Sequence, residues 1–367
     1  MNIKNCLVDG LLFLHGCLRS RKALPENQRE RFLIVSTTGL GDTLWATPAI
    51  RALRMRFPQS YIAVLTSGIG HQILEHNPHI DEIFTVGDPA VYSLFRHYGS
   101  LKKRNIDTAL IFHTSQRPIL PFCKMIGAKE IMGTEGLNKG LDHLLTHRLP
   151  RCRQHEILRR LNIASSADVQ GAGLQMEFFL SPDDEAAAAE LIERWNIPPF
   201  LPIVGLHPGA KDKYKQWHPE GFIALGHRLY ETTGCHIVIT GNSEEKPLVD
   251  KIAASIPHAI PLAGRLPLRT SAALIKKMAL MVSNDTGPMH VAFAMHTPTV
   301  VLFGPTDPAL CGPLTSSGTG SRATVLAKPR TCTPCLGKKC RDPFCMLQIS
   351  VDDVYHSALR SLSLSTE

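Results

Sequence analysis

The residues with the most recognisable chemistry lie in short loops between predicted strands and helices. One loop, Ser283-Asn284-Asp285-Thr286-Gly287-Pro288-Met289-His290, ends inside the first turn of a predicted helix. Backbone N–H groups at a helix start are unpaired, and the helix dipole favours negative charge there. We expect Thr286 and Gly287 to offer amides to an anion such as phosphate, and His290 to donate to the same group. Asp285 could instead only cap the helix.

A second loop follows another predicted strand and carries several lysines. It runs from His207-Pro208-Gly209-Ala210 to Lys215-Gln216-Trp217. Gly209 and Ala210 are small residues at the carboxyl end of a strand, and Lys215 would supply a mobile positive charge for a phosphate. A solvated lysine beside a packed tryptophan would give the same local pattern.

A third loop, Gly241-Asn242-Ser243-Glu244-Glu245, again follows a predicted strand. A carboxylate in this position can accept two hydrogen bonds from the diol of a ribose. Acidic residues are also common at helix starts, so the loop alone is a weak indication of a nucleotide.

A fourth loop, Ser36-Thr37-Thr38-Gly39-Leu40-Gly41-Asp42-Thr43, lies between the first predicted strand and the first helix. Gly39 and Gly41 would let the backbone approach a ligand closely, and the helix start supplies free N–H groups. Asp42 is the one carboxylate of this loop, and it could serve only as a helix cap.

A dinucleotide fingerprint is the obvious rival interpretation of this fourth loop. It requires a third glycine where Leu44 stands, and an acidic residue after the second strand, where Thr66 and Ser67 stand. Both discriminating residues are absent from the sequence, which argues against a nicotinamide cofactor.

The elements that carry these loops alternate between short β-branched runs and helical patterns, which is typical of parallel α/β sheets. The pattern restarts after an acidic, alanine-rich stretch at 181–193, which predicts two doubly wound sheets with a cleft between them. In such sheets ligands bind outside the carboxyl ends of the strands. The predicted strands are 32–35, 61–65, 82–86, 108–112, 201–206, 236–240, 280–283 and 298–303, and the predicted helices are 49–56, 91–103, 219–231, 243–254 and one beginning near Gly287.

Composition agrees with a folded chain of two domains. The chain has 367 residues, of which 44% are hydrophobic and 20% charged, and a domain takes about 150 residues. The formal net charge is +8, which suits an anionic partner such as a nucleotide, a phosphorylated sugar, a nucleic acid or an anionic membrane face.

Residues 1–30 are predicted to be an extension before the first strand. Leu7, Leu11, Leu14 and Leu18 recur at helical spacing, and basic residues follow them. Such a helix would lie in the interface of an anionic membrane, or would dock on the protein's own surface. No apolar run approaches the about 20 residues that span a bilayer, so we expect a soluble intracellular protein.

Taken in order, these motifs resemble glycosyltransferase family 9, the bacterial heptosyltransferases that transfer heptose from an ADP-sugar onto the lipopolysaccharide inner core. The resemblance rests on Gly41-Asp42 followed by Thr47-Pro48, on His207-Pro208-Gly209, on Lys215 two residues before Trp217, on the loop from Ser283 to His290, and on Phe303-Gly304-Pro305-Thr306.

The resemblance implies an α/β protein of the GT-B fold, with two Rossmann-like doubly wound domains facing a cleft. The expected parts are the N-terminal extension 1–30, an acceptor-binding domain at 31–180, a nucleotide-sugar-binding domain at 181–345, and a C-terminal helix at 346–367 that packs back on the first domain.

The resemblance also implies roles for single residues. Asp42 would be the general base on the acceptor hydroxyl, Lys215 would hold the diphosphate of the donor, and Glu245 would bind the ADP ribose. Small hydroxyl residues often stand in the family where this chain has Gly209 and Ala210. The remaining donor-site residues implied are Asp285, Thr286, Gly287 and His290.

An inverting transfer of heptose from ADP-heptose to a Kdo or heptose acceptor of the inner core is the reaction that the resemblance implies. A lysine and a helix N-terminus can stabilise a departing ADP without a divalent ion, and the sequence contains no Asp-x-Asp metal clamp. We therefore expect that the reaction needs no cofactor. His113, Arg117 and Lys139 are candidate acceptor contacts, or simply solvated side chains.

The partners implied are ADP-heptose, a lipid-linked core oligosaccharide and the anionic cytoplasmic face of the inner membrane. A relative that moves another sugar or uses a protein acceptor is the alternative enzyme. A non-catalytic nucleotide- or nucleic-acid-binding module is the alternative outside enzymes; the sequence shows no zinc-finger spacing or aromatic RNA motif, so we expect no nucleic-acid partner.

Four cysteines cluster near the C-terminus, in a tail from Cys332 to Met346 that resembles the tail of many members of this family. Four thiolates can bind zinc tetrahedrally, although the spacing here is tighter than in common two-knuckle sites. A structural metal site is therefore the less favoured alternative to a disulfide or free thiols. The cysteines are Cys332, Cys335, Cys340 and Cys345.

Overall fold

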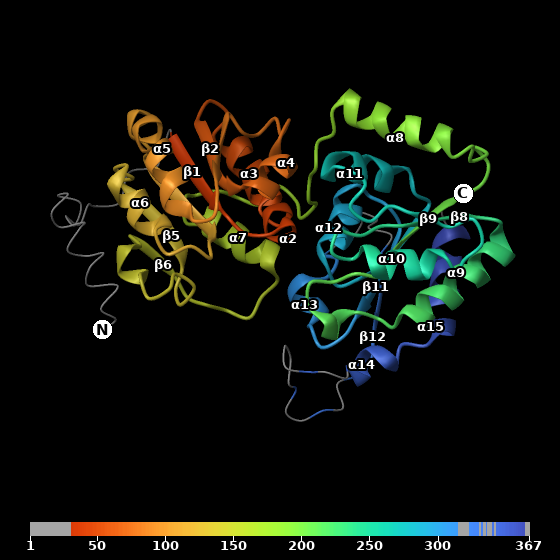
Figure 1. The fold of residues 1–367 in the computed structure, drawn as a ribbon. Helices are drawn as coiled ribbons and strands as arrows, with labels where there is room; N and C mark the ends of the chain where they lie inside the picture. Colours follow the sequence, from red (N-terminus) through yellow and green to blue (C-terminus); the bar gives the residue numbers. More distant parts are fainter. Residues whose placement is uncertain are drawn as a thin grey trace. The chain divides into compact units, whose positions relative to one another are not determined.

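The computed structural model describes residues 31–314, 323–329, 332, 335, 340 and 343–363. The chain divides into two compact units, with the first ending at Phe179 and the second beginning at Leu180 (Figure 1). This division falls within one residue of the predicted boundary between 180 and 181. The predicted extension 1–30 lies outside the described residues.

The first unit is built on a sheet of six parallel strands in the order β3-β2-β1-β4-β5-β6. The central strand β1 is apolar along almost its whole length because both of its faces are covered. The strands are β1 (Arg31–Ser36), β2 (Tyr61–Ser67), β3 (Glu82–Val86), β4 (Thr108–His113), β5 (Glu130–Thr134) and β6 (His147–Leu149).

Helices cover both faces of this sheet. Successive side chains of a strand point to opposite faces; Leu33 and Val35 join the core that includes residues of α5 and α6, whereas the ring of Phe32 contacts Phe57 at the end of α3. Helices α3 and α7 pack against each other. The helices are α2 (Leu40–Leu44), α3 (Thr47–Arg56), α4 (Gly68–Leu74), α5 (Ala90–Lys103), α6 (Ile119–Met125), η2 (Asp142–Leu144) and α7 (Glu156–Ser165).

The second unit repeats the same plan. Its six parallel strands lie in the order β12-β11-β10-β7-β8-β9, which is the order of the first sheet when the strands are counted from the start of the unit. The strands are β7 (Ile203–His207), β8 (His236–Ile239), β9 (Ile260–Pro261), β10 (Leu280–Asn284), β11 (Thr299–Phe303) and β12 (Ala323–Ala327).

The acidic stretch predicted to separate the two halves forms the first helix of the second unit. Ser181 and Asp184 make a capping box that fixes its start, and Asp184 also pairs with Arg269 of α11 at 2.6 Å. The helices of this unit are α8 (Pro182–Arg194), η3 (Lys213–Lys215), α9 (Pro219–Thr233), α10 (Lys246–Ala253), α11 (Leu268–Lys277), α12 (Gly287–Ala294), α13 (Pro308–Cys311), α14 (Phe344–Leu347) and α15 (Val351–Ser363).

The C-terminal helix α15 packs on α9 and on strands of the second sheet. Val354, Ala358 and Leu362 belong to the core of this unit. The buried residues of this helix complete the core of the second unit.

Both sheets have the strand order of a Rossmann-like doubly wound unit, so the predicted fold class is confirmed. The order reverses between β1 and β4 in the first unit and between β7 and β10 in the second. Ligands of such sheets bind at the carboxyl ends of the strands beside this reversal. No helix in the described part of the chain is long and apolar enough to cross a membrane.

Candidate functional site

Asp42 lies at the reversal point of the first sheet, in the first turn of α2 directly after β1. Its side chain is 24% exposed, and its Oδ1 accepts a hydrogen bond from Nη2 of Arg160 at 2.9 Å. The N-cap of α2 is Gly39, not Asp42. A methyl group at Gly39 would meet no atom within 4 Å, so the backbone here is open to a ligand.

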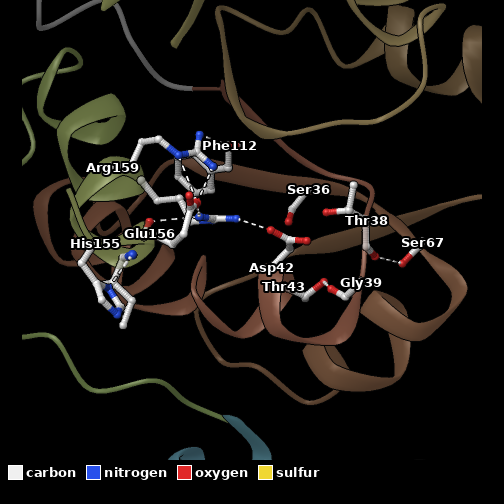
Figure 2. A network of polar contacts seen from close by, with 12 residues as sticks. Ser36, Thr38, Gly39, Asp42, Thr43, Ser67, Phe112, His155, Glu156 and Arg159 are labelled. Carbon is white, nitrogen blue, oxygen red and sulfur yellow. Dashed lines mark hydrogen bonds and ion pairs between the residues drawn. The ribbon is translucent and has the colours of Figure 1, made fainter. Parts of the chain in front are cut away.

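A chain of charged side chains from α7 leads to Asp42 (Figure 2). Arg160 is fully buried, and its Nη1 donates to Oε2 of Glu156 at 2.6 Å and to the Glu156 carbonyl at 3.0 Å. Arg159 donates to the same Oε2 at 2.6 Å and to the carbonyl of Phe112 at 2.8 Å. Burial would raise the pKa of Glu156, but the two guanidinium groups outweigh it and lower that pKa. The two guanidinium groups thus favour the ionised form of Glu156, and Arg160 holds the Asp42 carboxylate in one orientation.

Several buried polar atoms near Asp42 have no hydrogen-bond partner among the described residues. Figure 2 shows Ser36 and Thr38 beside the Asp42 carboxylate. Buried polar atoms are nearly always satisfied, so a group of orphans at one place indicates a bound polar molecule or water. The atoms near Asp42 are Ser36 Oγ, Thr38 Oγ1 and His113 Nδ1; Gln116 Oε1, in the loop after β4, also has no partner within the described ranges.

His113 ends β4, and its carbonyl accepts from the Thr37 amide at 3.1 Å. Burial and the positive charges of Arg160 and Arg159 lower the pKa of His113, against the opposite effect of Asp42. The imidazole is therefore neutral near pH 7, with an orphaned nitrogen. Beside it lies a cavity of about 10 Å³ lined by residues that include Asn138, which is room for about one water molecule.

The other two candidate acceptor contacts lie in loops of the first unit. Arg117 is in the loop between β4 and α6, and Lys139 is an exposed residue with a positive φ of 57° after β5. The structure thus places Arg117 in the loop that follows His113, and Lys139 in a different loop.

In the second unit, the structure brings Lys215 and Asp285 together at the reversal point of the sheet. Nζ of Lys215, in η3, donates to Oδ2 of Asp285 at 2.7 Å. Burial would lower the pKa of Lys215, but the charge and hydrogen bond of Asp285 outweigh it and raise that pKa. The side chains are 20% and 5% exposed, respectively, so the ammonium is charged and reaches the surface.

Helix α12 begins directly after this pair. Its N-cap, Thr286, makes no side-chain cap bond, and Pro288 follows in the first turn. Thr286 and Gly287 are partly exposed, so amides of the first turn are available to an anion. His290 is 4% exposed and its ring lies edge-on to Phe293. Its side chain is therefore buried beside the first turn of α12.

Asn284, at the end of β10, is hydrogen-bonded to the segment that follows β7. The sequence motifs did not single it out as a site residue. It is fully buried; its Nδ2 donates to the Pro208 carbonyl at 2.8 Å, and its Oδ1 accepts from the Trp217 amide at 3.0 Å. A polar residue at the end of the fully buried strand β10 was the available signal.

Gly209 and Glu245 are in direct contact. A Cβ on Gly209 would lie 2.0 Å from Oε1 of Glu245, so only glycine allows the carboxylate to rest on this backbone. Oε2 of Glu245 accepts from the Asn242 amide at 2.8 Å, which fixes the side chain. Ala210 is buried, and its carbonyl accepts from Gln216 at 2.9 Å.

The cysteine cluster lies in a segment of which only parts are described. Cys332, Cys335, Cys340 and Cys345 are not in disulfides. Within the described ranges, no group of three or more metal-ligating side chains is placed to hold an ion. Burial raises the pKa of the Cys345 thiol.

Comparison with known proteins gives a consistent picture. The model of glycosyltransferase family 9 (heptosyltransferase) matches residues 95–344. Lipooligosaccharide heptosyltransferase 2 of Haemophilus ducreyi is 24% identical over 302 residues, covering 77% of this chain and 86% of that protein.

Two solved structures share the fold. The glycosyl transferase family 9 structure from Veillonella parvula has a TM-score of 0.81 at 21% identity, over 94% of this chain and 99% of that one. The E. coli ADP-heptose lps heptosyltransferase II has a TM-score of 0.75 at 19% identity, over 92% of this chain and 100% of that one. Because the family model matches more than half of the sequence, this chain belongs to glycosyltransferase family 9 and is a glycosyltransferase.

Proposed function

We propose that this enzyme transfers heptose from ADP-heptose, with inversion, to a Kdo or heptose residue of the lipopolysaccharide inner core, on the cytoplasmic face of the inner membrane. The observation that carries the proposal is that each unit offers one half of such a reaction at its reversal point. Asp42 is held by a buried cation in one unit, and Lys215 lies beside an uncapped helix start in the other.

The second unit supplies what a departing nucleotide diphosphate needs. An ammonium has three donors, and Asp285 takes one of those of Lys215, which leaves others for phosphate oxygens. The amides of α12 add a favourable dipole. Together they stabilise the negative charge that grows on ADP as the glycosidic bond breaks, without a metal ion. Glu245 would accept hydrogen bonds from the ribose hydroxyls.

The first unit supplies what the acceptor needs. Arg160 binds Oδ1 of Asp42, which leaves Oδ2 to take the proton from the attacking hydroxyl. The orphaned atoms of Ser36, Thr38 and His113 would bind neighbouring sugar hydroxyls. A carboxylate with one oxygen fixed presents the other in a defined direction, which favours attack on the anomeric carbon.

The relatives support the choice of sugar. The Haemophilus ducreyi protein is named a heptosyltransferase, and the E. coli structure is described as an ADP-heptose enzyme. We extend both properties to this chain because its Asp42, Lys215 and α12 start fit them chemically.

The direct test is to incubate the protein with ADP-heptose and a truncated core lipid and to measure the mass of the product. A mass gain of one heptose supports the proposal. A gain only with ADP-hexoses, or only on a protein acceptor, would identify a relative with another specificity.

A nucleotide thermal-shift assay tests the donor half alone. We expect ADP to stabilise the protein well beyond UDP, GDP or an oligonucleotide, and Lys215→Gln to remove most of that shift. Lys213→Gln, an exposed lysine of the same turn, is the matched control. A larger shift with an oligonucleotide would favour a nucleic-acid-binding module instead.

A further inference from the structure

Helix α5 of the first unit exposes an unusual set of large apolar side chains. Val91 is 59% exposed, Tyr92 is 74% and Phe95 is 85%. Their spacing puts them side by side on the helix surface, while Leu94 and Leu101 on the other side are buried in the core of the unit. Contiguous apolar surface of this kind marks an interaction site.

The same helix is strongly cationic. The sequence of α5 contains no Asp or Glu, and Arg96, Lys102 and Lys103 are exposed. Aromatic side chains beside exposed cations suit the headgroup region of an anionic bilayer, where rings insert and cations contact lipid phosphates. Each Lys or Arg near such a surface adds to the attraction.

The apolar end of α5 adjoins the proposed acceptor side of the first unit. The loop before α5 is held from both directions, because the Gly87 amide donates to Ser93 Oγ at 2.8 Å and the Gly87 carbonyl accepts from Gln116 Nε2 at 3.3 Å. Gln116 lies in the loop after β4 that also starts at His113. A lipid contact at α5 would therefore bring a lipid-linked acceptor to the carboxyl edge of the first sheet.

We propose that the exposed face of α5, defined by Val91, Tyr92, Phe95, Arg96 and Lys103, docks on the surface of an anionic lipid bilayer. The link between this docking face and a lipid-linked acceptor rests on the proposed function, but the docking itself is measured without donor or acceptor. A failure of one is therefore distinguishable from a failure of the other.

The test is co-sedimentation of the full chain with vesicles of phosphatidylglycerol and phosphatidylethanolamine, compared with vesicles of phosphatidylcholine alone. We expect binding to the anionic vesicles that weakens as salt is raised. Tyr92→Ser with Phe95→Ser should weaken it on the order of tenfold, and Arg96→Gln with Lys103→Gln by a similar factor. The matched control is Phe200→Ser, which removes an 82% exposed aromatic from the second unit and should leave binding within about twofold.

Two further measurements separate the other occupants of this face. The tryptophan fluorescence of Phe95→Trp, after subtraction of the wild-type spectrum, should be that of a solvent-exposed indole. It should shift to the blue when anionic vesicles are added. Emission that is already blue-shifted without vesicles would mean that residues 1–30 or a second copy of the chain covers the face. If the wild type is a dimer and the Tyr92/Phe95 variant is a monomer, the second copy is what covers it. Either result overturns the proposal, as does equal vesicle binding by all variants.

Transfer to a delipidated, water-soluble acceptor provides the last control. The Tyr92/Phe95 variant should retain wild-type turnover with that acceptor and lose turnover with the acceptor embedded in vesicles. Equal turnover with both acceptors would contradict a docking role for α5.

Discussion

At the scale of single residues, the buried guanidinium of Arg160 is the most informative feature of the first unit. A buried charge costs several kcal/mol unless it is paired and hydrogen-bonded. Here the Nη atoms of Arg160 donate hydrogen bonds to Asp42 and Glu156, while its Nε has no partner among the described residues. Such a cost is expected where a side chain must hold another in one orientation.

Arg160→Lys should therefore damage catalysis more than folding. A lysine ammonium cannot bridge two carboxylates with the planar geometry of a guanidinium, so Asp42 would lose its fixed orientation. We expect kcat to fall on the order of 10- to 100-fold, with donor affinity unchanged within about twofold. Steady-state kinetics and a donor titration measure the two effects separately. Arg148→Lys, an exposed arginine of β6, is the control, and an unchanged kcat in Arg160→Lys would refute the positioning role.

Local sequence motifs single out residues whose types could carry chemistry, but not the residues that hold them in place. Asp42, Lys215 and Asp285 stand in motif-like loops, and the structure pairs the last two directly. Arg160 is 118 residues from Asp42 and lies in an ordinary amphipathic helix. Its role depends on how α7 packs, which no local pattern encodes.

At the scale of elements, the loop after β7 contacts the loop after β8. Gly209 of the first loop lies against the carboxylate of Glu245 in the second. Long β-branched runs predicted the central strands correctly. The sequence patterns did not indicate β5, β6, β9 and β12. Of these, β6, β9 and β12 lie at sheet edges and β5 lies between β4 and β6; β6 has 3 residues and β9 has 2. These strands exist because a neighbour pairs with them, so tertiary context decides them rather than propensity.

Gly209→Ala should weaken donor binding through Glu245. The added Cβ would overlap Oε1 of Glu245, and the carboxylate must move from its place against the loop. We expect the Kd for ADP to rise about tenfold, and the double variant with Glu245→Ala to be no worse than Glu245→Ala alone, as shared contacts are not additive. Isothermal titration of ADP provides the measurement.

Gly171→Ala is the matched control for this pair, because its Cβ would meet nothing within 4 Å. Fully additive effects of Gly209→Ala and Glu245→Ala would show that the glycine acts independently of the carboxylate.

At the scale of the whole molecule, one buried histidine of the second unit couples stability to pH. His207, at the end of β7, contacts Thr240 Oγ1 through Nδ1 at 3.0 Å, and burial lowers its pKa to about 4. The unfolded chain has an ordinary pKa near 6.5 and so binds more protons than the folded protein between pH 6.5 and 4. Stability is therefore fully present above pH 6.5 and is lost as the pH falls through this window.

The expected contribution of His207 is about 3 kcal/mol between pH 7 and pH 4. Chemical denaturation at a series of pH values measures it as the difference between the wild type and His207→Gln. The variant should show a flatter decline in the free energy of unfolding below pH 6.5. Parallel curves for the two proteins would show that His207 does not titrate with folding.

The repeated strand order of the two units gives the molecule two separate reversal points, one with Asp42 and one with Lys215. We propose that these points have different roles, the first acting on the acceptor hydroxyl and the second on the donor diphosphate. Asp42→Asn separates them, because the amide keeps the size of the side chain and removes its capacity as a base.

The most direct measurement is to titrate ADP-heptose into Asp42→Asn and to assay transfer to a core-lipid acceptor with the same preparation. We expect a donor Kd within about twofold of wild type and a rate of transfer reduced on the order of 10²- to 10⁴-fold. Loss of donor binding together with transfer, or transfer at the wild-type rate, would contradict this division of roles.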